Sequence, residues 1–292
     1  MKFIDPVTLL KLSNLEIRAR YVVEGFITGI HSSPYYGHSL EFAQHRQYSM
    51  GDELKYIDWK VYARTDKFFV KQYQEETNLR AYIVLDISKS MKFPAEEKID
   101  KFTYGLHLAA VLSYLLLKQD DSVGLIVFDN KIVKFIPPRV QSGHFSNIIN
   151  ILENLTAGED TQISKIIYEF TKFLKRRGLI IFISDLFDKP QEVLRSIKSL
   201  KFTHHDVIVF HILSTYERDF PYTGTVNFES SENPSFKIKT DTENIVREYK
   251  SIFQTFIQEY KIGFRNSGID YCLLYTDTPL EVGLSSFLSK RK

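Results

Sequence analysis

The sequence has one cysteine, no long apolar run and almost no net charge, and each of these shortages excludes a class of protein. Cys272 stands alone, so no internal disulfide can form and a reducing compartment is expected. The longest apolar segment, residues 106–117, has twelve residues and is too short to cross a bilayer. The N-terminus carries frequent charges and has no apolar signal-peptide run. We therefore expect a soluble, cytoplasmic protein without direct membrane insertion.

The charge balance excludes a second class. The 38 Lys and Arg residues almost match the 36 Asp and Glu residues, and the short basic patch at 172–177 is typical of a solvated helix end. A nucleic-acid-binding protein needs a basic face or stripe, so we expect no nucleic-acid partner. The glycine patterns of nucleotide-binding loops are absent as well. With 292 residues and 43% hydrophobic content, the chain can bury one large core or two modest ones.

Five apolar runs follow residue 80, and their residues are apolar at consecutive rather than alternate positions. They span residues 81–85, 122–128, 178–184, 207–213 and 271–275. Strands covered on both faces have this pattern, which favours a parallel sheet between helix layers. Stretches with helical spacing lie between the runs, within residues 99–116, 163–173, 191–200 and 245–260. The sequence predicts a three-layer α/β domain over residues 80–292, doubly wound with a mostly parallel sheet, and residues 131–136 at its edge.

The first 79 residues differ in composition, being rich in Tyr, His, Gln and charge. Asp5 and Pro6 predict a helix start, as N-cap and first helical residue. Residues 68–76 alternate with polar residues and predict a strand that pairs at an edge of the main sheet. Because this segment is too polar to close its own core, we expect residues 1–79 to pack on the α/β domain as a wrap.

Oxygen-bearing side chains follow two of the predicted strands. Asp86, Ser88 and Ser90 alternate directly after the first apolar run, so their side chains point the same way. Asp185 ends the run at 178–184, and Thr161 precedes a predicted helix. The carboxyl ends of parallel strands meet at one edge of a sheet, where ligands bind. Two carboxylates and three hydroxyls suit a hard cation, so we predict a Mg²⁺ (or Mn²⁺) site with the five ligands Asp86, Ser88, Ser90, Thr161 and Asp185.

This set resembles the metal-ion-dependent adhesion site of von Willebrand factor A domains. In that family a D-x-S-x-S motif follows the first strand, a threonine comes from a later loop and an aspartate ends a further strand. The resemblance covers residues 80–275 and implies a non-enzymatic protein-interaction module. In such a module a partner protein supplies an Asp or Glu carboxylate as the remaining ligand of the cation.

A second resemblance concerns residues 37–64, which are similar to the signature of the bacterial domain-of-unknown-function 58 proteins. It places an N-terminal family-specific segment, residues 1–79, ahead of an A-type domain, and implies an adaptor for a MoxR-type AAA+ ATPase in complex assembly or maturation. Charge pairs among Arg46, Asp52, Asp58 and Arg64 that pin the segment to the domain, with Trp59 as anchor, are our interpretation of the signature. The alternative is a docking surface or an acid/base site. The matched residues are Glu41, Phe42, Arg46, Tyr48, Gly51, Asp52, Ile57, Asp58, Trp59, Ala63 and Arg64.

Two alternatives stay open from the residues themselves. A Mg²⁺-dependent phosphoester hydrolase would use Asp86 and Asp185, and it would need a general base beside the ion. His204 and His205 are candidates for this base, but they precede a predicted strand and so belong to the opposite end of the sheet. The other alternative keeps the fold without the ion, with loop hydroxyls that cap helices.

Overall fold

The structure is a computed structural model that describes residues 5–12, 14–31, 45–48, 59–71, 79–94, 98–174, 176–229 and 237–289. The chain divides into two compact units, one of residues 1–29 with 79–292 and one of residues 30–78. The expected wrap of residues 1–79 is thus divided between the units. Its first 29 residues belong to the large unit, and the packing of residues 30–78 on the α/β domain stays a prediction.

A six-stranded sheet forms the centre of the large unit, in the order β10-β7-β6-β3-β4-β5. Five strands run parallel, and β5 runs antiparallel to β4 at the edge, so the doubly wound, mostly parallel sheet is confirmed. Each predicted apolar run is a strand. The bounds are β3 Arg80–Asp86, β4 Ser122–Phe128, β5 Ile132–Arg139, β6 Leu179–Ser184, β7 Asp206–Leu213 and β10 Asp270–Tyr275.

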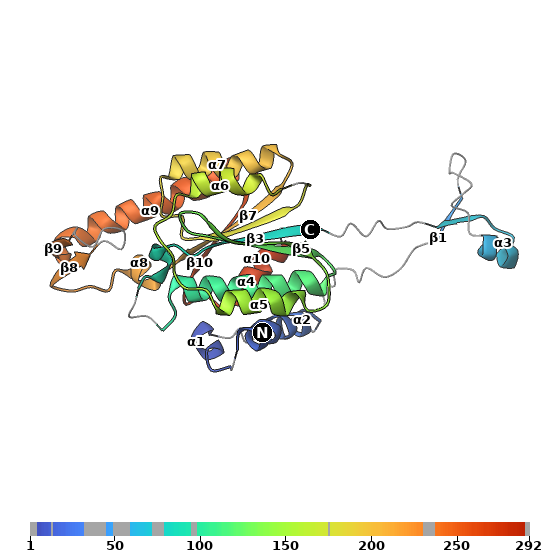
Figure 1. Cartoon of the computed structure of the whole chain (residues 1–292), viewed down its shortest axis with the longest axis horizontal. Coiled ribbons are helices and arrows are strands. Elements are labelled where there is room, and N and C mark those ends of the chain that lie inside the picture. The colour runs from blue at the N-terminus through green and yellow to red at the C-terminus, as the bar shows by residue number, and fades with distance from the viewer. Residues whose placement is uncertain are drawn as a thin grey trace. The chain divides into compact units, whose positions relative to one another are not determined.

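Helices cover both faces of this sheet (Figure 1). Alternate residues of β3 show why, because Ile83 and Leu85 join one buried core and Tyr82 and Val84 join the other. The first core contains α4 Lys101–Lys118, α5 His144–Glu153 and α10 Leu280–Ser289. The second contains α6 Ile163–Thr171, α7 Pro190–Phe202 and α9 Thr242–Asn266. The sheet is therefore buried on both sides, as its apolar strands require.

Two N-terminal helices, α1 Pro6–Leu9 and α2 Leu15–His31, add to the first core. The Asp5 side chain accepts a hydrogen bond from the Thr8 amide, as predicted for the N-cap. On α2, Arg18 Nη1 lies 3.0 Å from His107 Nε2 of α4. Burial, with the Arg18 charge, lowers the pKa of His107 to about 4, so the neutral ring accepts this hydrogen bond.

The edge strand β5 has two features that the sequence imposes. Pro137 and Pro138 lie within it, and neither has an amide hydrogen to donate. Its pairing with β4 shifts register between Val123 and Leu125. A Cβ on the intervening Gly124 would lie 2.9 Å from the Ile136 carbonyl oxygen, so this close approach requires glycine.

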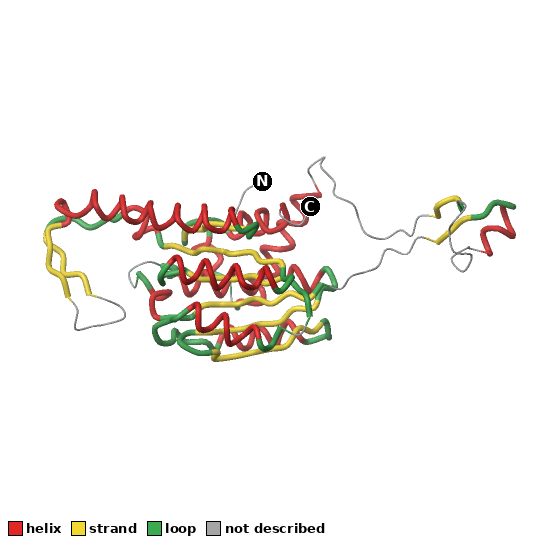
Figure 2. Tube along the Cα trace, turned by 90° about the horizontal axis from the view of Figure 1, so that it is seen from above, coloured by secondary structure: helices red, strands yellow, loops and turns green. Residues whose placement is uncertain are grey.

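The far end of α9 carries a hairpin of β8 Thr225–Glu229 and β9 Lys237–Asp241. Figures 1 and 2 show α9 continuing beyond the sheet with the hairpin at its start. The short helix α8 Thr215–Asp219 precedes the hairpin. The Phe220 ring lies 4.6 Å from the Tyr249 ring of α9 and 5.9 Å from the Phe228 ring of β8, and so joins the hairpin to the helix.

The second unit, residues 30–78, contains β1 His45–Gln47, α3 Trp59–Thr65 and β2 Phe69–Lys71. The structure describes residues 68–71 of the strand predicted at 68–76, and for these the prediction of pairing at an edge of the main sheet is wrong, because β2 pairs antiparallel with β1. The Tyr62 and Phe68 rings stack 4.4 Å apart beside this pair. An aromatic contact between α3 and the residue before β2 thus accompanies the pairing of the two strands.

The signature residues are divided by the described ranges. Arg46, Tyr48, Trp59, Ala63 and Arg64 lie within them, and Trp59 begins α3 with its ring edge-on to Tyr62. Glu41, Phe42, Gly51, Asp52, Ile57 and Asp58 lie outside the described residues, and so do the charge pairs predicted for Asp52 and Asp58.

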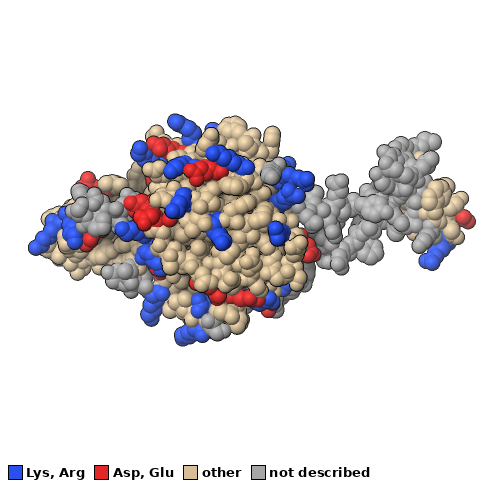
Figure 3. Space-filling model, viewed as in Figure 1, with Lys and Arg blue, Asp and Glu red and all other residues tan. Residues whose placement is uncertain are grey.

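Across the described ranges, none of the helices combines the length and apolarity needed to span a bilayer. On the face drawn in Figure 3, basic and acidic side chains of the described residues are interspersed over the surface. Both signs of charge therefore alternate on this face.

Candidate metal centre

The strand order reverses between β3 and β6, which are neighbours in the sheet but are separated by β4 and β5 in the chain. The connection after β3 runs through α4 on one face, and the connection after β6 runs through α7 on the other. Open α/β sheets bind ligands at the carboxyl side of such a reversal. Asp86 ends β3, and Ser184 ends β6 with Asp185 next in the chain.

Asp86 is fully buried at this point, and both of its oxygens accept hydrogen bonds. Oδ1 accepts from the Ser88 amide at 2.8 Å, and Oδ2 accepts from the Ser184 hydroxyl at 2.7 Å. Burial, followed by the nearby charge of Asp185, raises the pKa of Asp86 to about 7. A cation beside this carboxylate would stabilise its charged form and so oppose the rise of its pKa.

Ser88 and Ser90 bring two hydroxyl groups together beside Asp86. Their Oγ atoms lie 3.2 Å apart, Ser88 is buried and Ser90 is half-buried. Ser88 occupies the N-cap position of the short 3-10 helix η2 Lys89–Lys92, and its hydroxyl makes no capping hydrogen bond there. The Ile87 amide donates to the Phe128 carbonyl at 2.9 Å, so β4 holds the loop in place.

Thr161 reaches this edge through its loop. The Gly158 amide donates to the Ile87 carbonyl at 2.7 Å, and the Lys89 amide donates to the Glu159 carbonyl at 3.2 Å. The Thr161 hydroxyl donates to the Asp129 carbonyl at 3.1 Å, so the oxygen keeps its lone pairs for another contact. Backbone contacts therefore link the loop of Thr161 to the loop that follows β3, and the role of Thr161 as a ligand stays a prediction.

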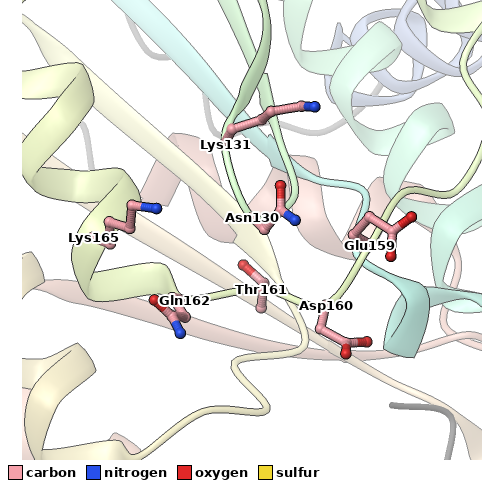
Figure 4. A pocket seen from close by; sticks show the side chains of 7 residues that line it. All are labelled: Asn130, Lys131, Glu159, Asp160, Thr161, Gln162 and Lys165. Carbon is pink, nitrogen blue, oxygen red and sulfur yellow. The ribbon is translucent and has the colours of Figure 1, made fainter. Parts of the chain in front are cut away.

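An open pocket of about 770 Å³ is lined in part by this loop. Figure 4 shows Asn130 and Thr161 near its middle, with Lys131 and Lys165 coming from different elements. The lining contains both signs of charge. It consists of Asn130, Lys131, Glu159, Asp160, Thr161, Gln162 and Lys165.

Asp185, the fifth predicted ligand, is fully buried and already has a cationic partner. Its Oδ2 accepts a hydrogen bond from Lys101 Nζ at 2.8 Å, and the same ammonium donates to Glu217 Oε1 at 2.6 Å. Burial by itself lowers the pKa of Lys101, but the two carboxylates outweigh it, so the pKa is raised and the amine stays charged.

His211 stands behind Asp185 with both ring nitrogens occupied. Burial lowers the pKa of His211 to about 4, so the ring is neutral. Nε2 lies 2.8 Å from the Asp185 carbonyl oxygen and therefore donates to it, which leaves Nδ1 to accept from the Tyr271 hydroxyl at 2.8 Å. The ring fixes the backbone of Asp185 and has no free nitrogen for acid–base chemistry.

The donor set fits a divalent cation. Asp86 with the Ser88 and Ser90 hydroxyls supplies hard oxygen ligands at one place, and Thr161 offers a fourth oxygen on the adjoining loop. Asp185 is held by Lys101, so it fits a role behind the ligands. Within the described ranges, no three His, Cys, Asp or Glu side chains gather as a metal site, which means that such an ion would depend on the hydroxyls.

The sequence-based reasoning missed Ser184, Lys101 and Glu217. A local signal existed for each one. Ser184 directly precedes Asp185, Lys101 puts a cation at the first position of a helix, where the helix dipole disfavours it, and Glu217 completes a Ser-x-x-Glu capping box with Ser214. None of these signals shows which carboxylate the lysine would meet.

Comparison with known proteins gives a family match over most of the chain. The model of the family described as "Protein of unknown function DUF58" matches residues 44–255. Two curated proteins, Uncharacterized protein Rv1480 of Mycobacterium tuberculosis and Uncharacterized protein Mb1516 of Mycobacterium bovis, are each 24% identical to this chain over 232 residues. These alignments cover 78% of this chain and 72% of each relative.

Solved structures with a similar arrangement include the conserved hypothetical protein BatB from Bacteroides thetaiotaomicron. It is 17% identical, with a TM-score of 0.49, over 73% of this chain and 98% of BatB. The VWA domain of SpRpn10 is 12% identical, with a TM-score of 0.41, over 72% of this chain and 94% of that domain.

Proposed function

This chain belongs to the family described as "Protein of unknown function DUF58", and from that premise we propose that it is a protein-interaction module that docks a partner at the carboxyl end of its sheet. The observation that carries the proposal is the convergence of Asp86 with the Ser88 and Ser90 hydroxyls where the strand order reverses. Asp86, Ser88 and Ser90 would hold Mg²⁺ or Mn²⁺, with Thr161 as a further ligand.

The neutral hydroxyl ligands determine how a cation bound at this site would behave. Three of the four ligands are hydroxyls, so the bound cation keeps most of its charge and attracts an anionic ligand from outside. The Ser184 hydroxyl donates to the Asp86 carboxylate, and Lys101 donates to Asp185. A glutamate or aspartate side chain of a partner protein would complete the coordination of such an ion. The family resemblance of residues 37–64 supplies a candidate partner, a MoxR-type AAA+ ATPase.

The test is co-purification of the partner from native lysate with Mg²⁺ and with a chelator. Asp86→Ala and the double change Ser88→Ala/Ser90→Ala should both reduce recovery to the level seen with chelator, because each removes direct ligands. The matched control is Asp206→Ala, which removes an exposed carboxylate at the opposite end of β7. Equal recovery by wild type and Asp86→Ala would contradict a metal-bridged contact.

Metal binding itself needs a separate measurement. Calorimetric titration with MgCl₂ and MnCl₂ should give saturable heat for wild type and for Asp206→Ala, and none for Asp86→Ala. Thermal unfolding should shift upward with metal in the same two proteins, since a ligand that binds only the folded state stabilises it. No heat and no shift at millimolar metal would favour the structural alternative, in which the hydroxyls only cap helices.

A further inference from the structure

Lys101 occupies a position that its own helix disfavours. It is the first residue of α4, where the backbone amides and the helix dipole repel a cation, and its side chain is fully buried. A buried ammonium persists only with compensating charge. Its presence there therefore requires partners strong enough to overcome both costs.

Two carboxylates and two aromatic rings provide that compensation. Lys101 Nζ lies 2.8 Å from Asp185 and 2.6 Å from Glu217, and neither carboxylate is more than slightly exposed. The same nitrogen lies 4.5 Å from the centre of the Phe187 ring and 5.8 Å from that of Phe93. The ammonium is thus enclosed, and it is a permanent cation of the fold.

This cation adjoins the candidate metal centre through a short chain of contacts. Asp185 follows Ser184, and the Ser184 hydroxyl donates to Asp86 at 2.7 Å. We propose that Lys101 is a positioning residue that limits the affinity of the Asp86–Ser88–Ser90 site for divalent cations by keeping the Asp185 carboxylate engaged. This inference rests on the proposed metal site. In it Lys101 does not bind the metal but limits how tightly the site binds it.

The decisive variant is Lys101→Met/Glu217→Gln. It removes one positive and one negative charge, so the net charge of the edge is unchanged, and Asp185 loses its cationic partner while keeping the hydrogen bond from the Phe187 amide. We expect Mg²⁺ and Mn²⁺ to bind about tenfold more tightly than in wild type, since a charged hydrogen bond of ~1.4 kcal/mol no longer competes. Titration calorimetry measures the affinity, and metal-induced thermal stabilisation checks it.

A matched control and a safer variant accompany this change. Lys201→Met/Asp206→Asn removes an exposed pair of the same type at the opposite end of the sheet, and it should leave metal affinity unchanged. Glu217→Gln alone keeps the buried lysine. It should weaken metal binding several-fold, because Lys101 then has Asp185 as its remaining carboxylate. This variant decides the question if the double variant does not fold.

Each outcome separates this inference from the proposed function. Tighter binding in the double variant supports the role of Lys101, and it does so even if wild type binds no metal, a result that would count against metal-bridged docking. Affinity equal to wild type in both Glu217→Gln and the double variant overturns the inference, while Asp86-dependent recovery of a partner would still support docking. Absence of binding in wild type and in every variant overturns the inference as well.

Discussion

Two aspartate–lysine pairs stand at opposite ends of the same parallel sheet. Lys101 and Asp185 lie 2.8 Å apart at the carboxyl end, and both side chains are 0% exposed. Lys201 and Asp206 lie 3.4 Å apart at the amino end of β7, where the side chains are 40% and 52% exposed. The residue types are the same, so the two pairs differ in their exposure to solvent and not in their chemistry.

Exposure to water determines how much each charge pair contributes to stability. At the amino end water screens the charges, and Arg177 shares Asp206 at 3.3 Å, so no single contact there is essential. At the carboxyl end water is excluded, and removal of one charge leaves the other buried without a partner. Substitution of a charged residue should therefore affect stability most at the carboxyl end of the sheet, where Asp86 also lies. Four substitution experiments break or sharpen this contrast.

The largest expected effect comes from Lys101→Met. This change leaves Asp185 and Glu217 buried without their cation, and it should lower the free energy of unfolding by about 3–5 kcal/mol. The same change at Lys201 should cost at most about 1 kcal/mol. Urea denaturation of both variants measures the difference. Similar losses in the two variants would show that burial does not separate the pairs.

The next effect is a pH dependence that belongs to Asp86. Its pKa rises from 3.8 to about 7 on folding, so between these values the folded protein keeps a proton that the unfolded chain has released. The stability contribution is complete below about pH 4 and is lost as pH rises toward 7, by about 1.4 kcal/mol per pH unit. Asp86→Asn removes this loss, so its stability relative to wild type should increase over that window.

The control for this pH dependence is Asp206→Asn. Its stability relative to wild type should stay within about 1 kcal/mol from pH 4 to pH 7, because its pairs are exposed. Difference curves from urea denaturation at each pH remove the contribution of His211, whose pKa is lowered to about 4 and whose effect on stability has the opposite sign. A flat difference curve for Asp86→Asn would contradict the prediction.

A smaller effect is expected at Ser184. Ser184→Ala removes the donor to Asp86 and the acceptor of the Leu186 amide at 2.9 Å, both buried, and should cost about 1–3 kcal/mol. Ser196→Ala is the matched change on the exposed face of α7, where the hydroxyl contacts only its own helix. That change should stay within about 0.5 kcal/mol. Thermal and urea unfolding distinguish the two.

The smallest effect belongs to Arg177→Ala. Its side chain is 72% exposed beside Asp206, so its loss should change stability by no more than about 1 kcal/mol, and by less as salt is added. Denaturation in 0.05 M and about 0.5 M NaCl tests this expectation. A large effect that persists in salt would mean that the amino end is as sensitive as the carboxyl end.

Most of the fold was predictable because strands covered on both faces leave a direct mark in the sequence. The run at 178–184, for instance, has no polar position until Ser184, and this feature alone required helices on both sides. The pairing of β2 was not predictable in this way. A strand of three residues has too little periodicity to indicate its partner from sequence alone.

The candidate site followed the same division. Strand ends placed Asp86 and Asp185 at one edge, since both follow runs whose boundaries are sharp. The engagement of Asp185 was not readable, because Lys101 comes from a helix start 84 residues away and Glu217 from a helix beyond β7. Long-range charge pairing leaves no spacing rule in a single sequence. Burial of a lysine is visible only in three dimensions.

The two prolines of β5 limit how copies of this molecule can associate through that edge of the sheet. An exposed strand at the margin of a sheet invites another chain to extend the ladder, which is a common route to aggregates. Pro137 and Pro138 interrupt the row of donors there, so lateral growth by strand addition is blocked over that stretch. A crowded cell could therefore hold many copies side by side, with less risk of their joining through this margin.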